Sequence, residues 1–296
     1  MRILVTGGAG FIGSNLAQTL ERKDHEVVVL DNFSSGSFRN LVQFRGEVVV
    51  GGCDVMPTGR FDIVSHQASI TDTTVTDQFA MMRNNLEGFR TVLAWAAQWN
   101  ARVVWASSAA VYGNSPAPMR ESMPPAPLNV YGYSKLAMEH LARRWHQETK
   151  LPIVGLRYFN VYGPGEGHKG KFASMIYQLA QQMKKGHRPR IFHDGGQRRD
   201  FVWIGDVLSA NLLAMQVQGC HVCNVGSGKA ESFNTVIAEL NSVLKTNLQP
   251  DYFPNPYDFF QKHTEADISL AGAALGYVPE VGLQQGIAHY YAAKEL

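Results

Sequence analysis

The sequence predicts an α/β protein built on a doubly wound parallel sheet. Three observations carry this prediction: strand and helix patterns alternate through the first half, a glycine-rich turn joins the first strand to the first helix, and polar side chains follow the later strands. The chain has 296 residues, of which 45% are hydrophobic. It can therefore bury one large core or two modest ones.

The alternation of strands and helices is clearest in the first half of the chain. Short runs of apolar and β-branched residues are typical of strands that a parallel sheet buries on both faces. The predicted strands are residues 2–6, 26–30, 47–50, 62–66, 102–106 and 153–158. Between them lie predicted helices at residues 12–22, 79–99 and 134–147. This order indicates βαβ units with right-handed crossovers.

A glycine-rich turn, GGAGFIG at residues 7–13, follows the first predicted strand. Glycines at these spacings allow a tight turn and a close approach to a pyrophosphate, whose charge the N-terminus of the next helix favours. The second strand ends at Asp31, where a carboxylate can bind the hydroxyl groups of an adenosine ribose. The predicted dinucleotide contacts here are Gly7, Gly10, Phe11, Ile12, Gly13, Asp31 and Asn32.

The pattern loosens after Gly163, where glycine and proline stops become frequent. The predicted elements there are helices at residues 172–185, 233–244 and 268–275, a helix from Asp206, and strands at residues 190–193 and 201–204. We expect a dinucleotide-binding domain over residues 1–163, to which segments near 198–228 and 262–275 return. Residues 164–296 should form mainly a smaller α/β substrate-binding lobe that is interleaved with the sheet.

Composition and charge argue against several kinds of protein. The formal net charge is +2 and no basic block is present, which argues against nucleic acid as a partner. No apolar run approaches the ~20 residues needed to span a bilayer, so no membrane partner is expected. The N-terminus enters a strand directly and does not read as a signal peptide. A cytoplasmic protein is therefore expected.

The three cysteines, Cys53, Cys220 and Cys223, suit a reducing compartment. Cys220 and Cys223 have the spacing of a metal or redox pair, but no second ligand pair accompanies them. They also lie in a strand-like run that ends at Gly226. We therefore expect a buried structural strand here and no metal site.

Tyr131 and Lys135 are spaced four residues apart in a segment that reads as the start of a helix. Residues at this spacing lie on one face of a helix. A lysine beside a phenol is expected to lower the phenol pKa by favouring the phenolate. The pair would then supply a base at neutral pH, next to a redox cofactor bound at the glycine turn.

Two serines follow the predicted strand at residues 102–106. Because ligands bind outside the carboxyl ends of parallel strands, a hydroxyl from Ser107 or Ser108 would emerge beside a bound nicotinamide. Either serine could instead cap a helix or a turn. Together with Tyr131 and Lys135, a proton relay is favoured, in which the tyrosine takes a hydroxyl proton while hydride passes to the nicotinamide.

These features resemble the extended short-chain dehydrogenase/reductase family of nucleotide-sugar enzymes over nearly the whole chain. The resemblance is carried by the glycine turn, the Ser108 turn, Tyr131 with Lys135, and RYFNVYGP at residues 157–164. It implies a Rossmann dinucleotide-binding fold, a nucleotide-sugar substrate and an NAD(P)-dependent isomerase.

The same resemblance implies a role for each matching residue. Catalysis is assigned to Ser108, Tyr131, Lys135 and Lys169, the last as a second acid or base on the other side of the substrate. Substrate binding is assigned to Ser108, Asn160, His168, Lys169, Phe192 and Arg199, with Arg199 on the nucleotide diphosphate. Asp54 and Val55 match an adenine contact, and Asn85 matches a helix asparagine that supports the site.

A narrower resemblance, to the heptose 6-epimerases of this family, is carried by GHKG at residues 167–170 together with residues 127–135, 199–202 and 226–233. It implies that an ADP-glycero-manno-heptose is inverted at C6 through a 6-keto intermediate. It also implies a homo-oligomer, a pentamer in this branch. A 4-epimerase of a UDP- or CDP-hexose and a non-catalytic NAD(P)-binding scaffold stay open as alternatives.

Two departures from family patterns refine these expectations. Related dehydratases place an acid–base pair just after the serine, where this chain has Ala109 and Ala110, so dehydration is disfavoured. The heptose enzymes generally favour NADP and carry lysines after the second strand. Here Asp31 would repel a 2′-phosphate and only Arg39 is within reach. NAD and NADP both stay open as the cofactor.

Overall fold

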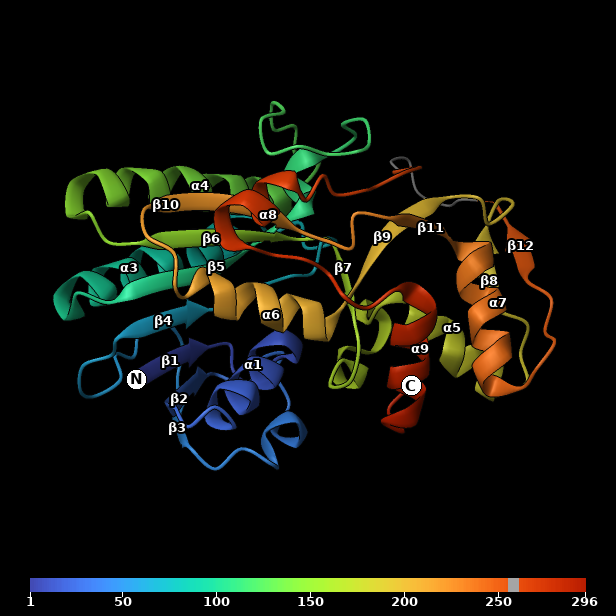
Figure 1. Cartoon of the computed structure of the whole chain (residues 1–296), viewed down its shortest axis with the longest axis horizontal. Helices are drawn as coiled ribbons and strands as arrows, with labels where there is room; N and C mark the ends of the chain where they lie inside the picture. The colour runs from blue at the N-terminus through green and yellow to red at the C-terminus, as the bar shows by residue number, and fades with distance from the viewer. Residues whose placement is uncertain (255–260) are drawn as a thin grey trace.

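The computed structural model describes residues 1–254 and 261–296. A central sheet of seven parallel strands has the order β10-β6-β5-β4-β1-β2-β3 (Figure 1). These strands are β1 (Arg2–Thr6), β2 (Glu26–Asp31), β3 (Glu47–Val50), β4 (Ile63–His66), β5 (Arg102–Ser108), β6 (Ile153–Tyr158) and β10 (Cys220–Val225). The order reverses between β1 and β4, and the doubly wound parallel fold is confirmed. Such a reversal leaves a crevice at the carboxyl ends of the strands, where ligands bind in folds of this class.

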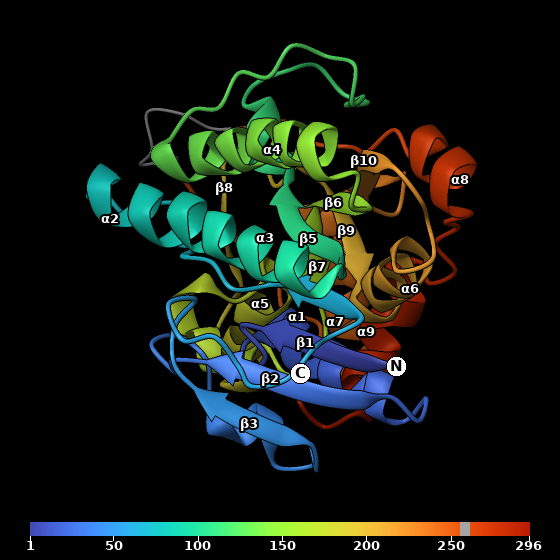
Figure 2. The same cartoon turned by 90° about the vertical axis from the view of Figure 1, so that its left-hand side faces the viewer.

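Helices cover both faces of this sheet (Figure 2). One face carries α1 (Phe11–Glu21), α6 (Ile204–Ala214) and α8 (Ser269–Leu275). The other face carries α3 (Gly88–Trp99) and α4 (Val130–Thr149). Because both faces are covered, the strands are apolar along almost their whole length, as the sequence pattern indicated.

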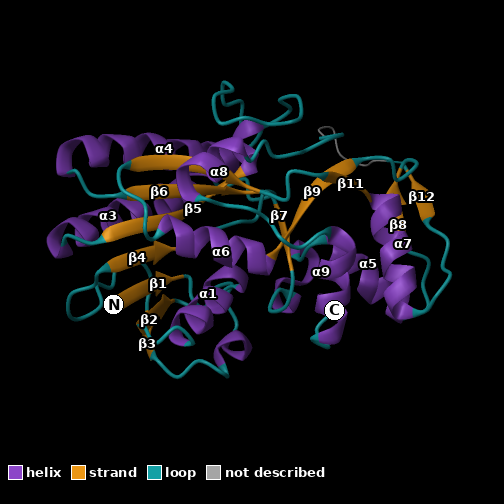
Figure 3. Ribbon diagram, viewed as in Figure 1, coloured by secondary structure: helices purple, strands orange, loops and turns teal. Residues whose placement is uncertain are grey.

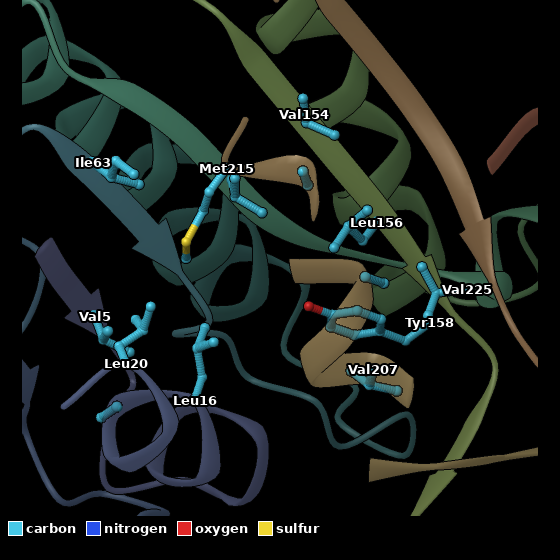
Figure 4. Packing of buried hydrophobic residues seen from close by; sticks show 14 of the residues in the cluster. Val5, Leu16, Leu20, Ile63, Val154, Leu156, Tyr158, Val207, Met215 and Val225 are labelled. Atoms are coloured by element: carbon cyan, nitrogen blue, oxygen red, sulfur yellow. The ribbon is translucent and has the colours of Figure 1, made fainter. Parts of the chain in front are cut away.

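The core under α1 and α6 shows how the first helix is held on the sheet (Figure 4). Leu16 and Leu20, one helical turn apart on α1, are fully buried against sheet residues that include Val5. Burial of each such side chain stabilises the fold by about 1.5–3 kcal/mol relative to exposure. This packing fixes the N-terminus of α1, and with it the glycine turn, at the carboxyl edge of the sheet.

A second group of elements lies beyond that edge, to the right in Figures 1 and 3. It contains β7 (Asn160–Tyr162), β8 (Arg190–Phe192), β9 (Arg198–Trp203), β11 (Ala230–Ser232), β12 (Asp251–Phe253), α5 (Met175–Lys184), α7 (Phe233–Leu244) and α9 (Leu283–Ala292). Its helices share a separate hydrophobic core with strands β8 and β9. Meanwhile β10, α6 and α8 return to the large sheet. The start of the segment expected to return near residues 198–228 does not do so, because β9 pairs with β7 and β11 in a separate sheet. The division into two domains stays a prediction.

Several predicted boundaries differ from those in the structure. The helix expected at residues 79–99 consists of α2 (Gln78–Met82), a π-helical turn η2 (Arg83–Glu87) and α3. Helix α4 begins before the expected residue 134, because the Asn129 side chain caps it by accepting a hydrogen bond from the Gly132 N–H. Tyr131 therefore lies in the first helical turn. The helix expected at residues 172–185 begins only at Met175, after the short helix η4 (Gly167–Phe172).

Some elements were not predicted at all. Helix α9 was missed, although Ile287 and Tyr290 are fully buried, because Gly286 interrupts its apolar pattern and Gly286 is the third of only three buried residues. Strands β7, β11 and β12 have three residues each, too few to show a period. The expected structural strand at the cysteines is confirmed as β10, with Cys220 and Cys223 as free thiols. Across the described residues, no helix is both long and apolar enough to cross a membrane.

Candidate active site

A cavity of about 2160 Å³ lies along the carboxyl edge of the parallel sheet and is lined by both groups of elements. It contains nearly all of the residues that the sequence singled out. They are Gly7, Gly10, Phe11, Ile12, Gly13, Asp31, Asn32, Asp54, Ser108, Tyr131, Lys135, Asn160, His168, Lys169, Phe192 and Arg199. Val55 and Asn85 lie outside this lining.

The glycine turn has the shape of a phosphate cradle. Gly7 has φ +68°, and a Cβ there would lie 2.6 Å from the Ala68 nitrogen, so only glycine fits. A Cβ on Gly13 would collide with the carbonyl oxygen of Gly7. Helix α1 follows, and its N-cap, Gly10, provides no side-chain hydrogen bond to the first turn. The free N–H groups of this turn fit a pyrophosphate.

The opposite end of the cradle is acidic. Asp31 at the end of β2 accepts hydrogen bonds from the N–H groups of Ala9 and Phe33, each at 2.8 Å. Each carboxylate oxygen has a further lone pair, so ribose hydroxyls can still bind there. Asn32 and Asp54 line the same end. Val55, expected to contact adenine, instead lies against Gly51 outside the cavity lining, because the turn after β3 folds back on itself.

Tyr131 and Lys135 lie on one face of α4, as predicted, with the lysine Nζ 5.8 Å from the centroid of the phenol ring. The expected lowering of the phenol pKa by Lys135 is wrong for this structure. Burial raises the pKa of Tyr131, and a hydrogen bond with Ser108 opposes that rise. The reason is that the Lys135 ammonium is held elsewhere, so desolvation of the phenolate dominates.

Lys135 is buried and is held by two oxygens. Its Nζ donates hydrogen bonds to the Ser69 hydroxyl at 2.5 Å and to the carbonyl oxygen of Ala106 at 2.8 Å. Burial lowers its pKa from 10.5 to about 7. Lys135 is therefore poised between its charged and neutral forms near neutral pH, which suits proton transfer.

The two serines at the end of β5 have different roles. Both serines line the cavity, but the Ser107 hydroxyl is buried and donates to the Glu139 carboxylate at 2.8 Å. The Ser108 hydroxyl accepts from the Ala110 N–H at 3.1 Å, capping the short helix η3 (Ala109–Tyr112), and it also bonds Tyr131. Ser108 thus both caps the short helix η3 and contacts the proposed catalytic Tyr131.

Asn85 lies next to the site and is fully buried in the π-helical turn. Its side-chain amide accepts from the Ile70 N–H and donates to the Ile70 carbonyl, at 2.8 and 3.1 Å. It also donates to the Ser134 hydroxyl at 3.0 Å. Asn85 therefore joins the helix of Tyr131 and Lys135 to the loop that carries Ser69. A π-helical turn inside a helix is frequently found at a functional site.

The wall opposite α4 comes from the loop between β7 and α5. Lys169 lies on η4, with its Nζ 5.5 Å from the centroid of the Phe11 ring. Burial lowers the pKa of Lys169, and the Glu166 carboxylate opposes this. His168 is half-buried on the same turn, with its Nδ1 2.9 Å from the Gly165 carbonyl oxygen. Asn160, an exposed residue of β7, lines the cavity between these two walls.

The far end of the cavity is basic and aromatic. Arg199 on β9 has its guanidinium carbon 6.0 Å from the centroid of the Phe233 ring. Burial lowers its pKa to about 10, so it keeps its charge at neutral pH. The Phe192 ring lies edge-on to that of Phe253 at 4.8 Å between centroids. A guanidinium beside flat apolar rings suits a diphosphate that carries a base.

A family model agrees with this architecture. The model of the NAD-dependent epimerase/dehydratase family matches residues 3–226. The chain belongs to this family. It is therefore an NAD-dependent enzyme of the nucleotide-sugar epimerase and dehydratase class, and the predicted resemblance and cofactor type are confirmed.

Solved structures of this family are similar over nearly the full chain. ADP-L-glycero-D-manno-heptose-6-epimerase of Helicobacter pylori is 40% identical with a TM-score of 0.92, covering 99% of this chain and 95% of that chain. UDP-glucose 4-epimerase of Thermotoga maritima, solved with UDP-glucose, is 29% identical with a TM-score of 0.91 and covers 99% of each chain. UDP-glucuronic acid 4-epimerase of Bacillus cereus, solved with UDP-glucuronic acid and NAD, is 29% identical with a TM-score of 0.86, covering 99% and 98%.

Several residues of this epimerase/dehydratase site were not found from the sequence. Ser69 holds Lys135, yet a lone serine after a strand carries no signal of that contact. Asn15 donates to the Pro164 carbonyl at 2.9 Å, and Asn40 lies 3.1 Å from His168 Nδ1. These amides join the glycine turn to the Lys169 loop. Such contacts span more than a hundred positions of the chain, which no local pattern can show.

Proposed function

We propose that this enzyme inverts C6 of an ADP-glycero-manno-heptose. The observation that carries the proposal is that two proton-transfer groups, Tyr131 on helix α4 and Lys169 on the short helix η4, line one cavity. An epimerase must protonate and deprotonate an oxygen while hydride reaches either face of one carbon, so it benefits from a group on each side. The 40% identity to a heptose 6-epimerase supports this substrate over others.

The opposite pKa shifts of these two groups support a division of labour. Burial lowers the pKa of Lys169 and raises that of Tyr131. In one direction Lys169 therefore acts as the base that takes the C6 hydroxyl proton. Tyr131 then acts as the acid that returns a proton to the same oxygen after the exocyclic carbon has rotated. Groups whose environments separate their pKa values are typical of acid–base pairs.

The remaining residues hold the substrate and the dinucleotide. Ser108 donates a hydrogen bond to the reacting oxygen, and Asn160 binds the sugar beside it. Arg199 binds the diphosphate through its charge, which it keeps at neutral pH. A bound NAD would accept hydride from the sugar carbon and return it. The glycine turn, Asp31 and Lys135 hold that dinucleotide in place.

NAD is proposed over NADP. An additional 2′-phosphate would approach the carboxylates of Asp31 and Asp54, which line the adenosine end of the cavity. The expected result is an affinity for NAD at least about tenfold above that for NADP, measured by titration of the protein after the bound cofactor has been removed. Equal affinities would contradict this part of the proposal.

The nearest rival is a 4-epimerase of a UDP- or CDP-hexose, which the UDP-sugar 4-epimerases among the similar structures favour. A non-catalytic NAD(P)-binding scaffold is a further alternative, but it would not need Ser108, Tyr131 and Lys135 together. Dehydration is disfavoured, because Ala109 and Ala110 follow the serine and cannot move protons.

The deciding experiment is incubation with ADP-D-glycero-D-manno-heptose, followed by proton NMR. Inversion at C6, without deuterium at C6 in heavy water, is expected because hydride returns within the site. Conversion of UDP-galactose in place of the heptose would favour the 4-epimerase. Tight NAD binding with neither sugar converted would favour the scaffold.

Lys169→Ala tests the second proton-transfer group in the same assay. Turnover is expected to fall by more than about 10²-fold. Lys171→Ala is the matched control, since Lys171 lies two residues away on the same turn but outside the cavity lining. A loss of only a few fold in both variants would remove Lys169 from the mechanism.

A homo-oligomer, which the resemblance implies, and a cytoplasmic location remain proposals. Light scattering and sedimentation would test the first, with a pentamer expected. The second rests on the reducing environment that three free cysteines suit.

A further inference from the structure

A buried ion pair lies next to the active site, between two residues that do not line the cavity. Glu139 on α4 is fully buried and Arg157 on β6 is 3% exposed. The carboxylate accepts hydrogen bonds from the Arg157 Nε at 2.8 Å and Nη2 at 2.7 Å, which is a bidentate arrangement. The same Glu139 Oε1 also accepts from the Ser107 hydroxyl at 2.8 Å.

These contacts join three elements that supply the site. Tyr131, Lys135 and Glu139 follow one another at four-residue spacing, so they lie along one face of α4. Ser107 pairs with Arg157 across β5 and β6, one position before Ser108 pairs with Tyr158. The carboxylate therefore ties the helix of Tyr131 directly to the strand end that carries Ser108.

The turn after Ser108 is held by the same arginine. The guanidinium carbon of Arg157 lies 4.7 Å from the centroid of the Tyr112 ring. Tyr112 ends η3, the short helix that Ser108 caps, and its hydroxyl donates to Asn224 at 2.7 Å. Ser108 is thus fixed from both sides, through Ser107 before it and Tyr112 after it.

Stability alone does not account for this pair. Replacing a buried ion pair with apolar side chains of similar volume is often neutral or stabilising, because desolvation of both charges opposes their attraction. Burial lowers the pKa of Arg157, and the bonds to Glu139 outweigh that effect, so the pKa is raised overall. Arg157 therefore keeps its charge and holds the Glu139 side chain in a bidentate geometry.

We propose that Glu139 and Arg157 are positioning residues, whose ion pair sets the Ser108 hydroxyl against the Tyr131 phenol through Ser107. This inference rests on the proposed function in one respect: turnover is measured with the same nucleotide sugar. The inference concerns the placement of the Ser108 hydroxyl relative to the Tyr131 hydroxyl. That placement matters for any sugar that this site converts.

Ser107→Ala is the sharpest test, because it removes the link to β5 and leaves the ion pair intact. The hydrogen bond with Ser108 lowers the Tyr131 pKa, so loss of this alignment should move the Tyr131 titration to higher pH by about 0.5 or more. The rate kcat should fall about tenfold or more, with KM changed less than about threefold. Ser107→Thr keeps a hydroxyl and should restore both quantities.

Two further variants complete the design. Glu139→Gln keeps the shape but loses the charge, and it should shift the titration in the same direction as Ser107→Ala. Thr264→Val is the control for loss of a buried hydroxyl, since Thr264 is 4% exposed and lies outside the cavity lining. It should leave kcat and the Tyr131 titration as in the parent chain.

The readouts separate this inference from the proposed function. The Tyr131 titration is followed by NMR of chains with ¹³C-labelled tyrosine, assigned with Tyr131→Phe, and it needs no turnover. If the parent chain converts no nucleotide sugar, the proposed function fails while the titration still tests the positioning. An unmoved titration in Ser107→Ala, with activity lost only in proportion to unfolded protein, would overturn the inference.

Discussion

At the scale of single residues, burial controls the chemistry of this site. Tyr131 and Lys135 are adjacent on one helix face, yet the lysine Nζ bonds Ser69 and Ala106 rather than the phenol oxygen. Their pKa values are therefore shifted mainly by desolvation, upward for the phenol and downward for the amine. Sequence spacing predicted that they would meet, but the direction of the phenol shift depended on contacts that only the fold shows.

Tyr131→Phe is expected to lower turnover by at least about 10²-fold, because the proton-transfer oxygen is lost. Binding of NAD and of the nucleotide sugar should stay within a few fold. Tyr133→Phe is the matched control, as Tyr133 lies on the same helix with its side chain exposed to solvent. Equal activity of both variants would show that residue 131 does not transfer a proton.

Lys135 should give the protein a pH-dependent stability. Its pKa is about 7 in the fold against 10.5 for a free lysine, so above pH 7 the unfolded chain binds one more proton than the folded one. The free energy of unfolding should then rise with pH between about 7 and 10. Denaturant titrations of the parent and Lys135→Met should diverge over this range, with the parent gaining relative stability. If the free energies of unfolding of the two proteins changed with pH in parallel, the lowered pKa of the buried Lys135 amine would be contradicted.

At the scale of elements, the glycine turn depends on backbone space more than on side chains. Gly13→Ala places a methyl group against the Gly7 carbonyl and should weaken NAD binding by at least about tenfold, because the cradle must open. Gly282→Ala is the control, since Gly282 is the N-cap of α9 and a Cβ there meets nothing within 4 Å. Calorimetric titration with NAD would measure both.

The elements also show what the sequence could and could not predict. Strands with a clear apolar pattern, such as β1 and β6, were predicted at their true bounds, because a buried strand is mostly apolar. The π-helical turn at Asn85 was not predicted, because it is stabilised by bonds to Ile70 and Ser134. The Glu139–Arg157 pair was missed for the same reason, since a charged residue on a helix usually indicates a solvated face.

At the scale of the whole molecule, Asp200 fastens the strand β9 to two distant segments. Its carboxylate accepts from the N–H groups of Ser227, Gly228 and Ala266, at 2.6, 3.0 and 3.0 Å. The first two follow β10 of the large sheet, so this single side chain joins the three-stranded sheet that contains β9 to the seven-stranded one. The interleaving expected from the sequence is held in part by this contact.

Asp200→Asn is expected to lower the free energy of unfolding by roughly 2–4 kcal/mol, because the amide nitrogen would face N–H donors in a buried site. Asp251→Asn should cost less than about 1 kcal/mol, since its ion pair with Arg190 is exposed. Urea unfolding of both variants measures the difference. A cost for Asp200→Asn no larger than that of the control would show that the clamp is dispensable.

The amide contacts of Asn15 and Asn40 have a consequence for building hybrid enzymes. They fasten the loop that carries Lys169 to a turn near the start of the chain. A chimera that takes its first sixty or so residues from another family member would inherit the new donor's Rossmann turn but lose these fasteners unless both asparagines were grafted with it. Exchange of this N-terminal piece should therefore shift Lys169, an acid–base group that lies outside the exchanged piece.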